Sequence, residues 1–175
     1  MKTWLVSVAV AIALVGGAAQ AGTENVAFPK GYGENYVLYT TVNKPSAKRG
    51  DTLRKFYINK SAMAAFKASK ALPSGTILVR EDWFTKKDAA KKSIIGPDGK
   101  FVTTKKKGVV VSEKRDGRGA DYPASLRNGN WEYAAFRANG ERNPKAKIKR
   151  CFGCHLSKKN DDFIFTMKAL RTAAK

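Results

Sequence analysis

The sequence predicts an α+β fold with more strand than helix, in a single domain. Short runs rich in β-branched and aromatic residues alternate with turns, and two stretches carry apolar residues at helical spacing. Glycine and proline mark the turns at Pro73-Ser74-Gly75, Pro97-Asp98-Gly99 and Asn128-Gly129. The sequence has no internal repeat, and residues 22–175 have a length that one hydrophobic core can serve.

Five strands are expected where β-branched or aromatic residues cluster between turn signals. These strands are Tyr36 to Val42, Leu53 to Asn59, Thr76 to Trp83, Gly108 to Glu113 and Trp131 to Ala138.

Two helices are expected to interrupt the strands. The first covers Ser61 to Lys70, with Asn59 or Ser61 as its N-cap. The second covers Asp161 to Ala173, with Asn160 as its N-cap and two aspartates near the positive end of the helix dipole.

The first 21 residues have the layout of a cleavable signal peptide. Lys2 precedes an apolar stretch from Trp4 to Val15, and Ala19-Gln20-Ala21 has the small residues of a cleavage site. The apolar stretch is shorter than the roughly 20 residues that a membrane-spanning helix needs. We therefore expect a soluble, periplasmic protein; a retained N-terminal anchor is the alternative.

The charge balance is strongly basic. The chain has 34 Lys and Arg against 14 Asp and Glu, a formal net charge of +20. Export argues against a nucleic-acid partner, whereas a positive field attracts acidic redox partners, anionic membrane surfaces or anionic small molecules. A solvated lysine coat is the alternative. The lysine-rich segment Lys86 to Lys107 is expected to be a long exposed hairpin or a loop.

A Cys-x-x-Cys-His motif follows the last expected strand, at Cys151, Cys154 and His155. This is the attachment pattern of haem c: two cysteines three apart reach one edge of the porphyrin, and the next residue supplies an imidazole to the iron. We predict one covalent haem c with His155 as the iron ligand. A zinc site would need about four ligands, and a thiol redox pair would need a thioredoxin-like unit.

The other side of the iron is expected to be open or weakly ligated. His155 is the only histidine, and Met63 and Met167 each lie on an apolar helical stripe that suits the core. An open position implies that a small molecule reaches the iron, whereas a pure electron carrier usually has both axial positions filled.

Other segments, together with the late haem motif on a strand-rich chain, carry a resemblance to a known family. They are Phe28-Pro29-Lys30-Gly31-Tyr32, Arg54 to Asn59, Phe66-Lys67, Ser74-Gly75-Thr76, Cys151 to His155 and Asp162 to Phe165. In their order and spacing they resemble the cytochrome P-460 family, which includes the β-sheet cytochromes c′-beta. The resemblance implies a mainly antiparallel sheet packed on one haem, a five-coordinate iron and, in many members, a homodimer.

The resemblance also implies site residues. Arg54 matches the family's arginine on the distal side of the haem, unless it is a strand arginine pointing to water. Hydroxylamine-oxidising members link a lysine to the porphyrin, and Arg80 stands at that position; arginine does not readily lose the proton that this link requires. Lys55 should point to the opposite face of its strand. The family's distal carboxylate aligns near Val110, so no acid is clearly supplied.

These departures move the resemblance towards cytochrome c′-beta, whose aromatic-capped distal pocket binds nitric oxide. Phe56 is the expected cap, and Phe84 or Phe101 a second ring, unless these are ordinary core aromatics. The expected function is binding of nitric oxide or a similar small ligand, with an ability to transfer electrons. The alternatives are a hydroxylamine-oxidising enzyme and a dedicated electron carrier; as an enzyme, the chain would be an oxidoreductase acting on hydroxylamine or nitric oxide.

Overall fold

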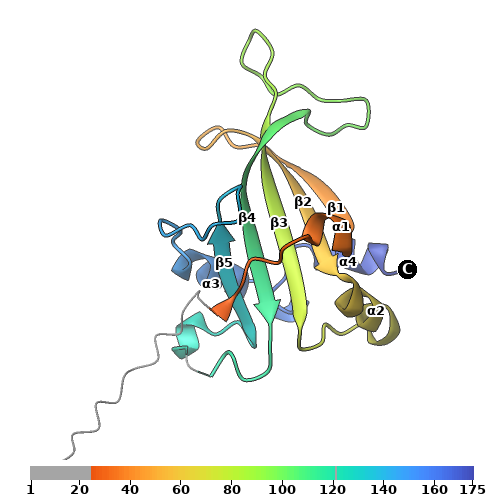
Figure 1. The fold of residues 1–175 in the computed structure, drawn as a ribbon, viewed down its shortest axis with the longest axis vertical. Coiled ribbons are helices and arrows are strands. Elements are labelled where there is room, and N and C mark those ends of the chain that lie inside the picture. Colours follow the sequence, from red (N-terminus) through yellow and green to blue (C-terminus); the bar gives the residue numbers. More distant parts are fainter. Residues whose placement is uncertain (1–24, 121) are drawn as a thin grey trace, which may run out of the picture.

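The computed structural model describes residues 25–120 and 122–175, and the expected signal peptide lies outside them. Five strands form one antiparallel sheet in the order β1-β2-β3-β4-β5, so each strand pairs with its neighbour in the chain (Figure 1). The elements, in chain order, are α1 (Tyr32–Asn35), β1 (Tyr36–Lys44), β2 (Thr52–Asn59), α2 (Lys60–Ser69), β3 (Thr76–Thr85), β4 (Thr103–Lys114), η2 (Ala124–Leu126), β5 (Trp131–Phe136), α3 (Lys149–Leu156), η3 (Lys159–Asp161) and α4 (Met167–Ala173). The predicted α+β class is confirmed.

The largest difference among the strands is in the lysine-rich segment. β4 begins at Thr103 rather than Gly108, so part of that segment belongs to the sheet. The rest joins β3 to β4 as a hairpin that extends beyond the sheet (Figure 1). Isolated pairs between Lys87 and Ser93 and between Ile95 and Phe101 order its two loops.

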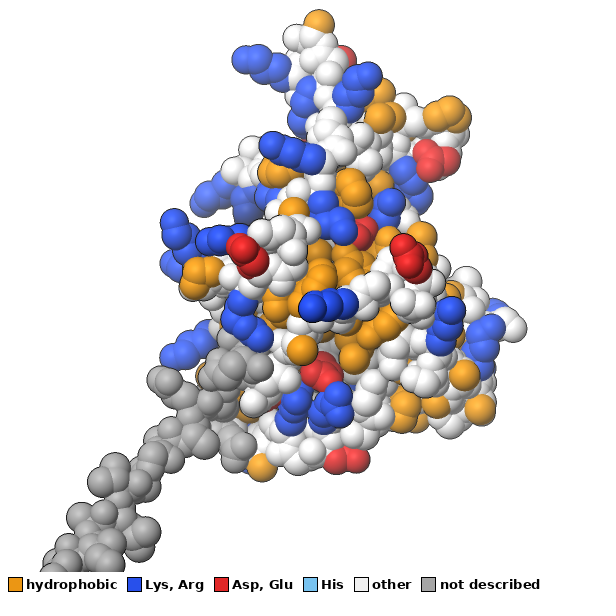
Figure 2. All heavy atoms as spheres, in the orientation of Figure 1, with side chains coloured by type: hydrophobic (Ala, Val, Ile, Leu, Met, Phe, Trp, Pro, Cys, Tyr) orange, Lys and Arg blue, Asp and Glu red, His pale blue; other side chains and the backbone are white. Residues whose placement is uncertain are grey.

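Alternation of side chains gives the sheet two faces. The helix face carries Phe56, Ile58 and Tyr133, which share an apolar cluster with residues of α2, α3 and α4. The front face, turned to the viewer in Figures 1 and 2, has a second cluster that includes Tyr57 and Val79. Figure 2 shows apolar side chains over the middle of this front face, with lysine and arginine around them.

A buried carboxylate lies on the front face. Glu81 is 3% exposed and accepts hydrogen bonds from the Tyr32 hydroxyl (2.6 Å), the Tyr57 hydroxyl (3.2 Å) and Trp83 Nε1 (2.8 Å). Lys106 Nζ lies 2.7 Å from the same carboxylate. The burial of this charge is therefore offset by a cation and three neutral donors.

The expected helix from Asp161 to Ala173 is wrong in its first half. Asp162 and Phe163 both have left-handed backbone, with φ of 50° and 60°, which no right-handed helix accommodates. A short 3-10 turn, η3, precedes this corner, and α4 begins only at Met167. The corner places the chain beside the Cys-x-x-Cys-His motif.

No helix in the described ranges 25–120 and 122–175 is long and apolar enough to cross a membrane.

Candidate haem site

The motif lies on α3. Cys151, Cys154 and His155 are three and four residues apart, so a helix brings them to one side. Both cysteines are free thiols; that of Cys151 is half-buried and that of Cys154 exposed. Phe152 anchors the helix on the sheet, with its ring centroid 4.9 Å from that of Tyr133 on β5.

His155 has the orientation and charge state of a metal ligand. Its Nδ1 lies 2.6 Å from the carbonyl oxygen of Phe163, and because a carbonyl only accepts, Nδ1 is the donor. This tautomer leaves the lone pair of Nε2 free to bind a metal. Burial lowers the pKa of His155 below its usual 6.5, so the imidazole is neutral at neutral pH, the form that metals bind. Its ring contacts those of Tyr133 and Phe165 at centroid distances of 4.7 and 5.0 Å.

Arg54, Phe56 and Arg80 all lie on the helix face. Phe56 pairs directly with Arg80 across β2 and β3, and Arg54 pairs with Asp82. Burial raises the pKa of the Cys151 thiol, and the charge of Arg80 opposes this effect. The same charge helps to lower the pKa of His155, so Arg80 is close enough to the motif to act on it electrostatically.

A carboxylate joins the two arginines. Asp82 Oδ1 lies 3.0 Å from Arg54 Nε, and Asp82 Oδ2 accepts a hydrogen bond of 2.9 Å from Arg80 Nη2. The side chains of both arginines are 28% exposed, so Arg54 does not simply point to water. Asp82 was missed from the sequence because an acid was sought only near Val110. Its place two residues after Arg80 on the same strand is the signal that could have found it.

One buried polar atom of this group, Arg80 Nε, has neither a hydrogen bond nor an ion pair in the described structure, whereas Arg54 Nε and Asp82 Oδ1 meet each other in the 3.0 Å ion pair. Such an atom is rare in folded proteins and requires a partner. Arg80 lies on the same face as the cysteines and Nε2 of His155, and its Nε fits a polar ligand or a haem propionate.

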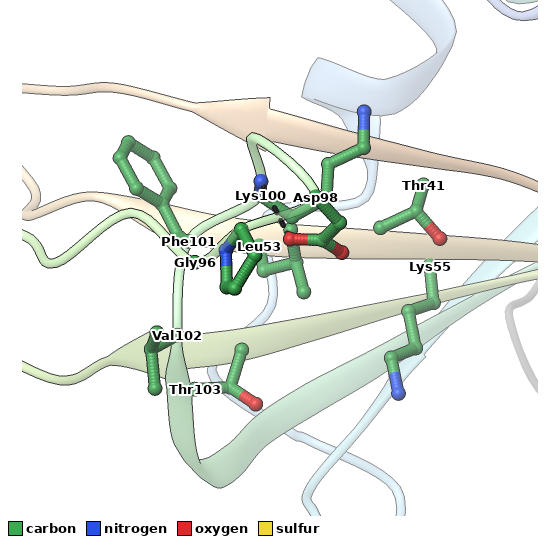
Figure 3. Close-up of a pocket in the computed structure, with 10 residues that line it drawn as sticks. Thr41, Leu53, Lys55, Gly96, Asp98, Lys100, Phe101, Val102 and Thr103 are labelled. Carbon is green, nitrogen blue, oxygen red and sulfur yellow. Dashed lines mark hydrogen bonds between the residues drawn. The ribbon is translucent and has the colours of Figure 1, made fainter.

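The other two aromatic candidates, Phe84 and Phe101, lie on opposite faces of the sheet. Phe84 pairs with Thr52 on the helix face and is 38% exposed, with Lys105 and Lys107 over its ring. Phe101 instead lines a groove on the front side with Leu53 and Lys55, which alternate with Arg54 and Phe56 along β2 (Figure 3). Phe101 is therefore wrong as a second ring beside Phe56.

The remaining expectations on the face concern Lys55, Val110 and the methionines. Lys55 points to the front face, where its Nζ lies 5.0 Å from the Trp83 ring. Val110 pairs with Arg80 and so belongs to the helix face without supplying a charge. Met63 and Met167 are 3% and 4% exposed and both lie in the apolar cluster of the helix face.

Within the part of the chain that the structure describes, no group of three or more His, Cys, Asp or Glu side chains could hold a metal ion. A structural zinc ion usually takes about four protein ligands, whereas haem needs one or two from the protein.

Comparison with known proteins agrees with the geometry. The family model described as Cytochrome P460 matches residues 29–166, from the segment before α1 to the residue before α4. No curated protein matches the chain. The matched family implies a haem cofactor. The match includes all five strands and the Cys-x-x-Cys-His motif, and this chain belongs to the cytochrome P460 family.

Proposed function

We propose that this chain, after removal of residues 1–21, is a periplasmic single-domain cytochrome. In this proposal Cys151 and Cys154 hold one haem covalently, and His155 binds its iron. The other side of the iron is open to nitric oxide or a similar small ligand. The observation that supports the proposal is the hydrogen bond from His155 Nδ1 to the Phe163 carbonyl, which leaves the lone pair of Nε2 available to a metal.

The open side is supported by the ligands that the chain can offer. The sequence has no second histidine, and the described methionines, Met63 and Met167, are buried in the apolar cluster. When bound, haem would supply an iron that takes diatomic ligands. Phe56, paired with Arg80, is the apolar group that would restrict the space to small ligands.

The spectrum of the purified protein tests this proposal. We expect a high-spin ferrous spectrum that changes rapidly when nitric oxide is added, because no side chain must first leave the iron. A resting spectrum typical of low-spin iron with methionine as the sixth ligand, together with slow or absent uptake, would contradict the open site.

Hydroxylamine oxidation is a second candidate because of Asp82. Oxidation of hydroxylamine releases protons, and a carboxylate near the reacting nitrogen is a suitable acceptor. Asp82 supplies that carboxylate, held between Arg54 and Arg80 at 3.0 and 2.9 Å.

The mass of the haem peptide separates the two functions. We expect proteolysis to release a haem attached only to the peptide of Cys151 and Cys154, since arginine at position 80 does not form the lysine link. A second peptide attached to the porphyrin, or rapid hydroxylamine turnover that is lost in Asp82→Asn, would favour the enzyme.

Electron transfer is supported by the surface around the motif. Exposed Cys154 has exposed Leu156 and Phe165 nearby, at 39% and 54% exposure. From Asn143 to Asn160 the sequence has no acid, and its cations are Lys145, Lys147, Lys149, Arg150, Lys158 and Lys159. An apolar centre with a basic rim suits transient docking of an acidic redox protein.

The dependence of the electron-transfer rate on ionic strength tests this docking. If these charges steer an acidic partner, the rate of electron transfer falls steeply between low and high ionic strength, because screening shortens the range of attraction. An unchanged rate would remove the basis for the acidic partner.

A further inference from the structure

The left-handed corner after α3 is built in an unusual way. Asp162 and Phe163 are consecutive residues with φ of 50° and 60°. A bulky residue such as phenylalanine rarely adopts this conformation, and when it does the surrounding structure must hold it there. The contacts of both residues show how this is done.

The side chain of Asp162 is held by two strands. Its Oδ2 accepts a hydrogen bond of 2.8 Å from Lys114 Nζ on β4, and its Oδ1 accepts one of 3.2 Å from Trp131 Nε1 on β5. Lys114 and Trp131 are direct partners across the two strands, and Trp131 is 1% exposed. Lys114 Nζ also donates to the carbonyl of buried Leu72 at 3.0 Å, so the lysine is itself held in place by a second contact.

Phe163 is held through its backbone and its ring. Its N–H donates to the carbonyl of Lys158, in the turn between α3 and η3, at 2.7 Å. Its ring lies on Gly129, where a Cβ would come within 3.2 Å of the ring and where φ is +57°. Because the N–H and the ring of Phe163 are both held, its carbonyl oxygen points at His155 Nδ1, 2.6 Å away.

We propose that Asp162, tethered by Lys114 and Trp131, is a positioning residue that holds the Phe163 carbonyl on His155 and so sets the donor strength of that imidazole towards haem iron. This inference rests on the proposed role of His155 as the iron ligand. A firm hydrogen bond to Nδ1–H makes the imidazole a stronger donor, which favours the ferric state. Weakening the tether should therefore weaken the iron–histidine bond and make the reduction potential more positive.

The test compares Asp162→Ala with the unchanged protein, both carrying haem. The iron–histidine stretching band of the ferrous protein, measured by resonance Raman spectroscopy, is expected to move to lower frequency in Asp162→Ala. The midpoint potential is expected to rise. Asp162→Asn should shift both in the same direction by less, because an amide oxygen still accepts from Trp131 and asparagine tolerates left-handed backbone. The Asp162→Asn variant also serves as the test if Asp162→Ala does not fold.

Asp161→Asn is the matched control. It removes the same charge one residue earlier, from a side chain that is 40% exposed and lies 3.7 Å from exposed Arg171. We expect its band and potential to equal those of the unchanged protein. Equal shifts in Asp161→Asn and Asp162→Asn would mean that only net charge matters, and this result would overturn the inference. An iron–histidine band that does not move in any Asp162 variant would overturn it as well.

A double-mutant cycle tests the tether itself. Lys114→Gln should shift band and potential as Asp162→Asn does, and combining the two should add little, because they break one contact. Fully additive shifts would overturn the tether. If the unchanged protein had no iron–histidine band at all, the proposed open haem would fail instead, so the two failures are distinguishable.

Discussion

Replacing both Cys151 and Cys154 by alanine is expected to abolish covalent haem attachment. The two thiols are the only sulfur nucleophiles in the sequence that can form thioethers, and the helix α3 brings them to one side. Haem-dependent peroxidase staining after denaturing electrophoresis should show a band for the unchanged protein and none for the double variant.

A single replacement provides the control. Cys154→Ala should keep one thioether, because the half-buried Cys151 is untouched. Its staining should persist while the pyridine haemochrome spectrum moves to the position of a haem with one vinyl group left. Staining that survives in the double variant would contradict attachment through this motif.

Replacing Glu81 by alanine is expected to destabilise the fold strongly. Lys106 would lose its buried partner, and Tyr32, Tyr57 and Trp83 would lose their acceptor on the front face. Breaking a buried charge pair from one side typically costs about 3–5 kcal/mol of unfolding free energy. Denaturant titration of the haem-loaded protein measures this loss.

Glu141→Ala is the control for Glu81→Ala. Glu141 pairs with Arg137, but their side chains are 62% and 55% exposed. Water and salt screen such a pair, so the unfolding free energy should change far less than in Glu81→Ala. A similar loss in both variants would show that the Glu81 contacts have no special weight.

The contribution of Glu81 should also depend on pH. Burial alone would raise the pKa of Glu81, but the hydrogen bonds from Lys106, Tyr32 and Trp83 outweigh it and hold the pKa below 4.5. A lowered folded-state pKa means that the stabilisation is complete above pH 4.5 and is lost as the pH falls through the folded-state value. The difference in unfolding free energy between the unchanged protein and Glu81→Gln should therefore shrink in acid.

Local sequence patterns were sufficient to predict the strands. Alternating β-branched and aromatic residues mark the five strands, whose cores match the structure to within a few residues at the ends. The spacing of Cys151, Cys154 and His155 is by itself the attachment pattern of haem c, so the haem prediction needed no knowledge of the fold. The same alternation also put Arg54 and Phe56 on one face and Lys55 on the other, and the register agrees.

Contacts between distant segments were not predictable in this way. The helix expected to begin at Asp161 does not form there because Lys114 and Trp131 hold Asp162 in a left-handed corner. Both partners are distant in the sequence, so the residues around Asp162 do not indicate them. Tyr32 is 49 residues from Glu81, so their hydrogen bond is equally invisible. Asp82 was missed for a different reason: the search followed an alignment with the family instead of the alternation along β3.

The order of the sheet has a consequence for biogenesis. Strands that are consecutive in the chain are neighbours in the sheet, so pairing can proceed by successive hairpins from the N-terminal end of the polypeptide. The thiols of Cys151 and Cys154 come after the last strand. In the proposed function, the enzymes that attach haem would therefore act on a chain whose strands have already paired, and attachment would be among the last steps of maturation.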